Sequence, residues 1–502
     1  MPSQPALGLL RPETYLSISS QSVIYVRIDS IVCADLTSMT ECDTARTYYF
    51  EADTALPAEG LDTVFNALQT VLASQQTLHW WGEDSDGEVV GYRYRWSTDT
   101  AWTYTTEESR EFVVPIRTAF DLFTFAVAAV DNDSLTDETP ATIVLPVQNS
   151  PPEIGFRFRS NPIVPDPSAE YTTFPTRTFV WDITDSDGLE TVDSVFYALD
   201  DTSAGAWLAL SAAAHSSVTL TNLTPGLHTF YVKTQDIAGA ESPIIQFPDS
   251  LDEAGPNTWR VLPVVGNIVI VDDFHQDNGN VALAWYRSIF DTIPGIGPGN
   301  YSVWEIGREL PFSETDITAT LGYFEHAYWY TGYTGIETYN AASNAINRFV
   351  LNGGNLFINV TEIKDTSFFW FPLSSTSAIN PTGRLLPGKV LNSALSPSLN
   401  LEISALIAVR IRSFESLAAG IDPVDGPTFE VLYRLEPPQD GDLWTGEPVV
   451  AGEYDHRAPL TPEAGKVIFF SVPFHSGGIP LLEGNGSGGK FISWAFRNRF
   501  LQ

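Results

Sequence analysis

The sequence contains little positive charge. Only five of its 502 residues are lysines, and none of them precedes Lys233. The 26 lysines and arginines face 62 acidic residues, which gives a formal net charge of −36. Nucleic acids and anionic lipid surfaces bind clustered positive charge, so this composition excludes both as partners. An acidic, lysine-poor surface suits a salty or extracellular setting where salt screens the repulsion, and simple solubility is the alternative explanation.

Cysteine is also scarce, because the chain contains only Cys33 and Cys42. They lie nine positions apart between two β-like runs, SVIYVRI and ARTYYF. At this spacing they could close a small hairpin loop as a disulfide, and two free thiols are the alternative. A structural metal site needs more ligands than this pair supplies.

Long apolar runs are absent as well. No stretch reaches the ~20 apolar residues of a membrane-spanning helix, so we expect no membrane-spanning segment. The first residues, MPSQPALGLLRPETY, have neither the basic start nor the apolar core of a secretory signal. We expect a secreted or bacterial cell-surface protein, with any export signal or lipid anchor outside this chain.

An internal repeat organises the first half of the sequence. One copy contains WGEDSDG (Trp81–Gly87) and the other WDITDSDG (Trp181–Gly188). Each copy continues to a second tryptophan, Trp102 or Trp207, and then to a β-like run that ends on an aspartate, Asp131 or Asp236. Four landmarks in the same order predict two similar β modules.

The chain is long enough for about three domains of roughly 150 residues. Residues 1–150 form the first predicted β-sandwich, with an N-terminal extension and a helical insertion at residues 60–74. The stiff pair Pro151-Pro152 marks the boundary to a second sandwich over residues 151–262. Residues 263–502 alternate apolar strands such as NIVIVDDF with amphipathic segments such as VALAWYRSIFDTI. This alternation predicts an α/β domain of flavodoxin-like type with a mainly parallel sheet.

Two resemblances extend these expectations. The segment from WWGEDSDGEVVGYRYRW to TIVLPVQNSPP resembles the immunoglobulin-like and fibronectin type III-like modules of secreted and surface bacterial proteins. The segments IVIVDDF, FVLNGGNLFINV and GKVIFFSVPF resemble class I glutamine amidotransferase-like domains. Active members of that family carry a nucleophilic cysteine in a strand-to-helix elbow. The elbow after Val360 reads Thr361-Glu362-Ile363 here, so the resemblance implies a degenerate domain without the amidotransferase reaction.

The two Asp-Ser-Asp-Gly turns provide candidate metal ligands. Carboxylates on alternate positions beside a glycine suit Ca²⁺, which binds hard oxygen ligands. Plain β-turns in which aspartate caps backbone amides are the alternative. The candidate calcium ligands are Asp84, Asp86, Asp131, Asp185 and Asp187.

Ligands of open α/β sheets bind beyond the carboxyl ends of the strands. In the C-terminal region this rule selects Asp272, Asp273, His275, Glu305, Trp329, Tyr330, Tyr333, Asn359, Thr361, Glu362 and His475. Acids, histidines and an aromatic wall suit a polar ligand such as a glycan. Hydrolysis assisted by a metal on Asp272, Asp273 and His475 is the catalytic alternative, and simple aromatic packing is the third.

These observations favour a non-catalytic exported bacterial protein. Its sandwiches are predicted to act as spacer or adhesion modules, and its C-terminal domain to bind a polar ligand, a glycan or a protein partner. A hydrolase and a structural subunit of an extracellular assembly remain the alternatives.

Overall fold

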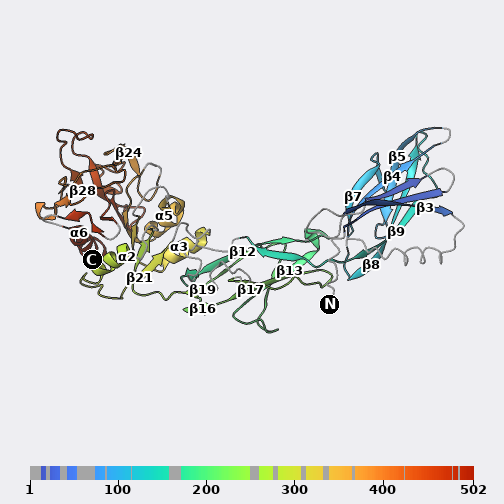
Figure 1. Cartoon of the computed structure of the whole chain (residues 1–502), viewed down its shortest axis with the longest axis horizontal. Coiled ribbons are helices and arrows are strands. Elements are labelled where there is room, and N and C mark those ends of the chain that lie inside the picture. Colours follow the sequence, from blue (N-terminus) through green and yellow to red (C-terminus); the bar gives the residue numbers. More distant parts are fainter. Residues whose placement is uncertain are drawn as a thin grey trace. The chain divides into compact units, whose positions relative to one another are not determined.

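Most of the regular structure in this chain is β (Figure 1). The computed structural model describes the strand backbones of residues 13–18, 23–33 and 42–53, and residues 74–84, 87–114, 116–157, 171–248, 259–274, 281–306, 313–331, 338–363, 368–422, 424–476, 479–483 and 487–502. The chain divides into two compact units, which are described separately. The first contains Met1–Arg157, Val180–Ser216 and Phe230–Gln246, and the second contains Phe158–Phe179, Ser217–Thr229 and Phe247–Gln502. This division does not test the two boundaries between the three predicted domains, which stay predictions.

Two sheets form the first module. One has the strand order β3-β2-β1-β4-β7 and the other β6-β5-β8-β9. Their strands are β1 (Glu13–Ile18), β2 (Val23–Cys33), β3 (Cys42–Asp53), β4 (Gln75–Gly82), β5 (Val89–Trp96), β6 (Thr103–Thr105), β7 (Ser109–Val113), β8 (Phe120–Asp131) and β9 (Ala141–Gln148). Alternating apolar residues of β4, β5, β8 and β9 point to a shared core, as expected of a sandwich.

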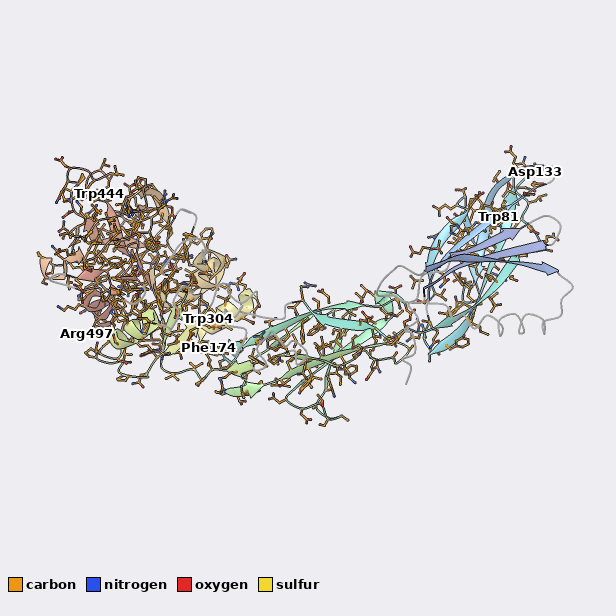
Figure 2. The ribbon with its side chains drawn as sticks, in the orientation of Figure 1. Trp81, Asp133, Phe174, Trp304, Trp444 and Arg497 are labelled. Atoms are coloured by element: carbon orange, nitrogen blue, oxygen red, sulfur yellow. The ribbon has the colours of Figure 1, made fainter. Side chains whose placement is uncertain are left out.

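Trp80 is the centre of that core. It is 1 % exposed and its ring lies 5.7 Å from that of Phe125 and 5.8 Å from that of Tyr94. Its neighbour Trp81 is 37 % exposed, because successive side chains of a strand point to opposite faces (Figure 2). The tryptophan that matches the buried Trp181 of the second copy is therefore Trp80, one position before the landmark chosen from the sequence.

The second module repeats the strand order of the first. Its four-stranded sheet has the order β14-β13-β17-β18, which corresponds to β6-β5-β8-β9. These strands are β13 (Val192–Leu199), β14 (Leu208–Ser211), β17 (Phe230–Asp236) and β18 (Ile245–Phe247). The internal repeat predicted from the sequence is thus confirmed by the strand order.

Two three-stranded sheets complete this region, with the orders β10-β12-β15 and β11-β19-β16. Their strands are β10 (Glu153–Phe156), β11 (Tyr171–Thr173), β12 (Arg177–Thr184), β15 (Ser217–Leu220), β16 (Gly226–His228) and β19 (Trp259–Val261). Strands β11 and β19 are paired in parallel, with Tyr171 opposite Trp259 and Thr173 opposite Val261.

The C-terminal region contains a ten-stranded mixed sheet of order β21-β20-β22-β23-β30-β29-β28-β25-β26-β33. The first five strands are parallel: β20 (Ile268–Asp272), β21 (Ser302–Glu305), β22 (His326–Tyr330), β23 (Asn355–Asn359) and β30 (Lys466–Phe470). The others are antiparallel: β25 (Val390–Ser393), β26 (Leu401–Ile403), β28 (Thr428–Leu435), β29 (Val449–Asp455) and β33 (Leu482–Glu483). A separate antiparallel pair joins β24 (Leu373–Ala378) to β27 (Arg412–Ser416).

The predicted fold class is therefore wrong. The chain is mostly β, and no flavodoxin-like or amidotransferase-like domain with a mainly parallel sheet is seen among the described residues. The βαβ alternation holds only as far as β23. The next strand in its parallel group is β30, and the chain between them adds antiparallel strands to the same sheet. Apolar periodicity identifies a strand but not its direction. The sequence pattern therefore could not distinguish the parallel strands of this sheet from the antiparallel ones.

Helices cover the parallel half of the sheet. They are α2 (Val281–Phe290), α3 (Glu314–Gly322), α4 (Thr338–Ala341), α5 (Ser343–Leu351) and α6 (Gly488–Ala495), which continues into the π-helical turn η3 (Phe496–Phe500). Side chains on the two faces of the sheet form separate cores. Ile270, Tyr328 and Tyr330 pack with α2 and α6 in one core, whereas Val271 and Trp329 pack with α3 and α5 in the other. Within the part of the chain that the structure describes, no helix is long and apolar enough to cross a membrane.

Candidate functional site

Asp273 follows β20 and is 2 % exposed. Its backbone amide donates to the carbonyl of Tyr330 at 3.1 Å. One carboxylate oxygen accepts the indole N–H of Trp329 at 3.1 Å and also the hydroxyl of Thr338. Burial raises the pKa of Asp273 to about 8 despite these two hydrogen bonds, and the nearby Asp272 adds to the rise. At neutral pH this acid is mostly protonated.

His475 is enclosed by aromatic rings. Its imidazole meets the rings of Phe274, Tyr286 and Tyr330 nearly edge-on, at centroid distances of 5.0, 5.1 and 5.7 Å. The residue is 2 % exposed. Burial lowers the pKa of His475 to about 4, so the ring is neutral at pH 7.

Asp273 and His475 contact opposite faces of the sheet. His475 packs on Tyr286 and Tyr330, which belong to one core. Asp273 bonds to Trp329, whose ring belongs to the other core and lies 6.4 Å from Trp304. An acid and a histidine that share a reaction must reach one substrate atom, which this placement does not allow. The structure therefore does not bring Asp273 and His475 together as the hydrolase alternative requires.

Three tyrosines pack together, and two of them, Tyr286 and Tyr330, contact His475. The ring of Tyr286, from α2, lies 4.1 Å from Tyr330 and 5.1 Å from Tyr328. All three side chains are fully buried, and burial raises the pKa of each phenol far above its ordinary value. They are therefore neutral packing groups at any physiological pH. Tyr286 was missed from the sequence, although its place on the apolar stripe of a helix opposite a buried strand was a usable signal.

Polar residues at the other strand ends bond to nearby backbone or surface groups. The amide nitrogen of Asn359 donates to the carbonyls of Phe470 and Val472, at 2.8 and 2.9 Å. Asn359 thereby ties the end of β23 to the chain that follows β30. Thr361 is buried. Glu362 lies 3.9 Å from Arg410.

Four further predicted residues of this rim differ in their outcome. Asp272 is half-buried, and its carboxylate accepts the backbone N–H of Phe274 at 3.0 Å. Glu305 is exposed. His275 and Tyr333 lie outside the described residues. The polar ligand site predicted here stays a prediction.

The strand-end aspartates of the two modules, Asp131 and Asp236, cap equivalent turns. Asp131 accepts the backbone amides of Asp133 and Leu135, at 2.9 and 2.8 Å. Asp236 accepts the backbone amide of Ala240 at 2.8 Å, four residues on, as Leu135 is from Asp131. In both turns the residue before that amide has positive φ, +66° at Ser134 and +89° at Gly239. These contacts are those of the turn-capping alternative.

The second Asp-Ser-Asp-Gly turn also bonds to protein groups. Asp185 accepts the amide of Asp187 at 2.8 Å and the hydroxyl of Thr191 at 3.1 Å. In the first turn Asp84 is half-buried and Asp86 lies outside the described residues. Within the described ranges no group of three or more His, Cys, Asp and Glu side chains could hold a metal ion. The calcium site stays a prediction.

Asp187 joins the two modules of the first unit. It is fully buried, and its two carboxylate oxygens accept the backbone amides of Ser74 at 3.0 Å and Ser150 at 2.5 Å. The hydroxyl of Ser74 donates to the carbonyl of Asp187 at 3.0 Å. Beside it, the amide group of Asn149 donates to Asp236 at 2.6 Å. A buried carboxylate with two amide donors holds both segments in place, because separating them would leave polar groups unpaired.

In the second unit, the start of β12 and the residues just before it pack on α3 and the turn that follows it. The hydroxyl and backbone amide of Thr178 donate to the two carboxylate oxygens of Asp316, at 2.6 and 3.0 Å. Phe174 meets Phe324 edge-on at 5.3 Å within the apolar core. Burial raises the pKa of Asp316, and the hydrogen bonds from Thr178 oppose that rise.

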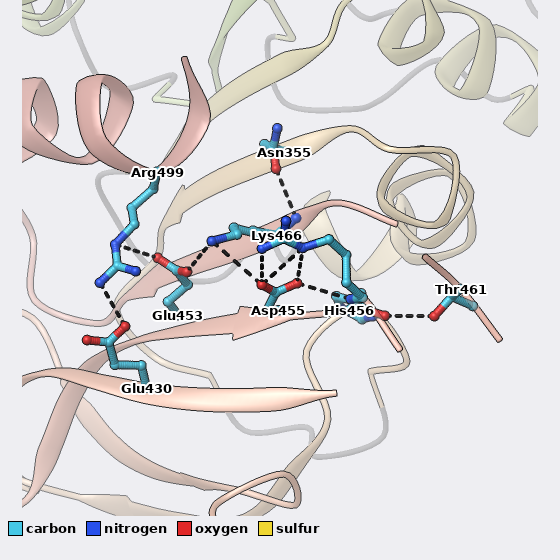
Figure 3. A network of polar contacts seen from close by, with 9 residues as sticks. Asn355, Glu430, Glu453, Asp455, His456, Thr461, Lys466 and Arg499 are labelled. Atoms are coloured by element: carbon cyan, nitrogen blue, oxygen red, sulfur yellow. Dashed lines mark hydrogen bonds and ion pairs between the residues drawn. The ribbon is translucent and has the colours of Figure 1, made fainter. Parts of the chain in front are cut away.

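An ion-pair network crosses β28, β29 and β30 (Figure 3). Glu453 is 4 % exposed and lies 3.0 Å from Lys466 and 3.3 Å from Arg499. Arg499 also reaches Glu430, at 2.7 Å. A buried carboxylate without partners would lower the stability of the fold. Lys466 and Arg499 therefore stabilise the sheet by pairing with Glu453.

Two N-terminal predictions stand apart. Cys33 and Cys42 are directly opposite each other in the β2–β3 pair, as the hairpin interpretation requires of the backbone. Their side chains are outside the description, so the disulfide stays a prediction. The helix expected at residues 60–74 lies almost wholly outside the described residues.

Comparisons with known proteins add little. No protein-family model matches the sequence, and no curated protein matches it. Among solved structures that match is one of the fibronectin(III)-like modules of Clostridium thermocellum CbhA. It is 14 % identical, covers 36 % of this chain and 81 % of its own, and has a TM-score of 0.17, a value that carries no conclusion about this chain.

Proposed function

We propose that this chain is a non-catalytic exported bacterial protein, secreted or held at the cell surface, whose β-sandwich modules act as a spacer. The junction at Asp187 carries the proposal. A spacer must hold neighbouring modules at a fixed separation, and this buried carboxylate binds Ser74 and Ser150, which flank strands of the first module. Its extracellular partner would be a protein or a polysaccharide.

The acidic composition supports an extracellular setting, because a net charge of −36 keeps such a protein soluble where salt screens it. The arrangement of Asp273 and His475 on opposite faces supports a non-catalytic role.

Distance measurement across the junction tests the spacer role. Spin labels introduced as non-natural amino acids at Thr142 and Leu208, both exposed, would report the separation of the two modules in the full chain. We expect one narrow distance distribution in the otherwise unchanged protein. Asp187→Ala should broaden it, whereas Asp193→Ala, an exposed acid of the same module, should not. A broad distribution without either substitution would contradict the proposal.

A further inference from the structure

One face of the first module has a charge opposite to that of the chain as a whole. In β5 the side chains of Tyr92, Tyr94 and Trp96 are buried in the sandwich, whereas Arg93 and Arg95 are exposed. Alternation along a strand therefore places both arginines on the outer face of the sheet β6-β5-β8-β9. No acid occurs among the described strand residues that point outward from this sheet.

Neither arginine forms an ion pair with an acid in the described part of the chain. Other basic side chains of this acidic chain, such as Lys389 and Lys466, lie within 4 Å of a carboxylate. Among the residues that the structure describes, Arg93 and Arg95 have no carboxylate at that distance. In the β5–β8 pair, Arg93 is opposite Ala128 and Arg95 is opposite Ala126. These neighbours are small, so no large side chain of β8 stands beside the two arginines.

Two aromatic rings flank the arginines. The guanidinium of Arg95 lies 4.7 Å from the centre of the Trp102 ring. Tyr104 is opposite Arg93 in the β5–β6 pair, is 53 % exposed, and donates its hydroxyl to the carbonyl of Val90 at 3.2 Å. It lies across Gly91, where an added Cβ would be 2.3 Å from the Tyr104 oxygen. Glycine at this position therefore lets Tyr104 lie close against the strand.

We propose that this face, defined by Arg93, Arg95, Trp102 and Tyr104, binds a carboxylated polysaccharide. Guanidinium groups bind carboxylates through paired hydrogen bonds, and flat exposed rings pack on the apolar faces of sugars. A polymer of uronic acids provides both features at short intervals. The proposal goes beyond the spacer role and does not depend on the Asp187 junction.

The second module provides a matched negative case. Its Lys233 also lies over a tryptophan, 5.1 Å from the ring centre of Trp207. Glu241, however, pairs with Lys233 at 2.6 Å and neutralises it. The corresponding sheet of the second module is thus not expected to attract an anion.

Titration of the full chain with oligogalacturonate, followed by calorimetry, tests the proposal. We expect binding that the double change Arg93→Gln and Arg95→Gln weakens at least tenfold. Tyr104→Ala, which leaves the charge intact, should weaken it severalfold, whereas Lys233→Gln should not change it. Because the chain carries a net charge of −36, binding should be strongest near physiological salt, where repulsion is screened beyond about 8 Å, and weaker at both lower and higher salt.

Three results would overturn the proposal. One is the absence of binding at millimolar oligogalacturonate. Another is equal affinity for the fully methyl-esterified oligomer, which lacks the carboxylates. The third is equal affinity for polyglutamate, which would identify an acidic protein as the partner instead. Unchanged circular dichroism of the variants confirms that a loss of binding is not a loss of fold.

Discussion

The two β modules share a strand order but not a surface. Both bury a tryptophan in the core and end a central strand on an aspartate that caps the following turn. In the second module Asp187 and Asp236 also accept hydrogen bonds from Ser150 and Asn149, and the half-buried Lys233 is neutralised by Glu241. In the first module Arg93 and Arg95 lie on the outer face, and no acid among the described residues pairs with them. The two modules share the residues that stabilise the fold of each, whereas their surface residues differ.

Substitution of the buried core tryptophan should destabilise both modules to the same degree. Trp80→Ala and Trp181→Ala each remove a side chain that is 1 % exposed. Each should lower the free energy of unfolding by about 3–5 kcal/mol, measured by chemical denaturation. Trp81→Ala is the control, with an expected change within about 0.5 kcal/mol. A large effect of Trp81→Ala would show that the two tryptophans have been matched wrongly between the modules.

Two buried titratable residues, Asp273 and His475, should change stability with pH in opposite directions. The pKa of Asp273 is raised to about 8 from about 3.9 in the unfolded chain, so its contribution to stability declines as pH rises between these values. The pKa of His475 is lowered to about 4, so its contribution is lost as pH falls from about 6.5. Of these two groups, only Asp273 titrates between pH 6.5 and 8, and it lowers stability by up to about 1.4 kcal/mol per pH unit.

Denaturation of the C-terminal unit at several pH values within that window measures the decline. Asp273→Asn should flatten it, since the amide cannot ionise. His475→Gln should leave it unchanged and alter only the response below pH 6.5. An equal decline in Asp273→Asn would assign the effect to another group.

The two capping aspartates should differ in proportion to their burial. Asp236 is 3 % exposed and accepts a bond from Asn149 as well as from its own turn, whereas Asp131 is half-buried and caps only its turn. Asp236→Ala should therefore cost about 2 kcal/mol and Asp131→Ala about 1 kcal/mol. Equal losses, measured by urea denaturation, would mean that the bond to Asn149 contributes nothing to stability.

The smallest expected difference in stability is between variants of the basic residues Lys233 and Arg93. Lys233→Ala removes both a contact with Trp207 and an ion pair with Glu241. It should lower stability by about 0.5–1 kcal/mol. Arg93→Ala should change stability by less than about 0.5 kcal/mol, since no ion pair is lost. Thermal unfolding of both variants would resolve the order, and a larger effect of Arg93→Ala would contradict it.

Local pattern predicted the modules well because each landmark acts locally. The strand-end aspartates cap amides within four residues, so their spacing repeats with the fold. The C-terminal sheet was mispredicted because the direction of β28 and β29 depends on partners that are remote in sequence. The strand-end rule selected Asp273 as a ligand-site residue, a role that stays a prediction. It could not show that Asp273 bonds to Trp329 and not to His475, since a shift of one residue along a strand reverses the face. The junction at Asp187 was not visible either, because its donors lie 113 and 37 residues away.

The parallel pairing of β11 with β19 has a mechanical consequence. If the ends of the second module are pulled apart, tension that enters after β19 and leaves before β11 draws these two strands in opposite directions along a common axis. The bonds between them are then loaded in shear and must break together, whereas an antiparallel hairpin under the same tension opens one rung at a time. Under tension applied in this way, the β11–β19 pair would be a main point of mechanical resistance in the second module.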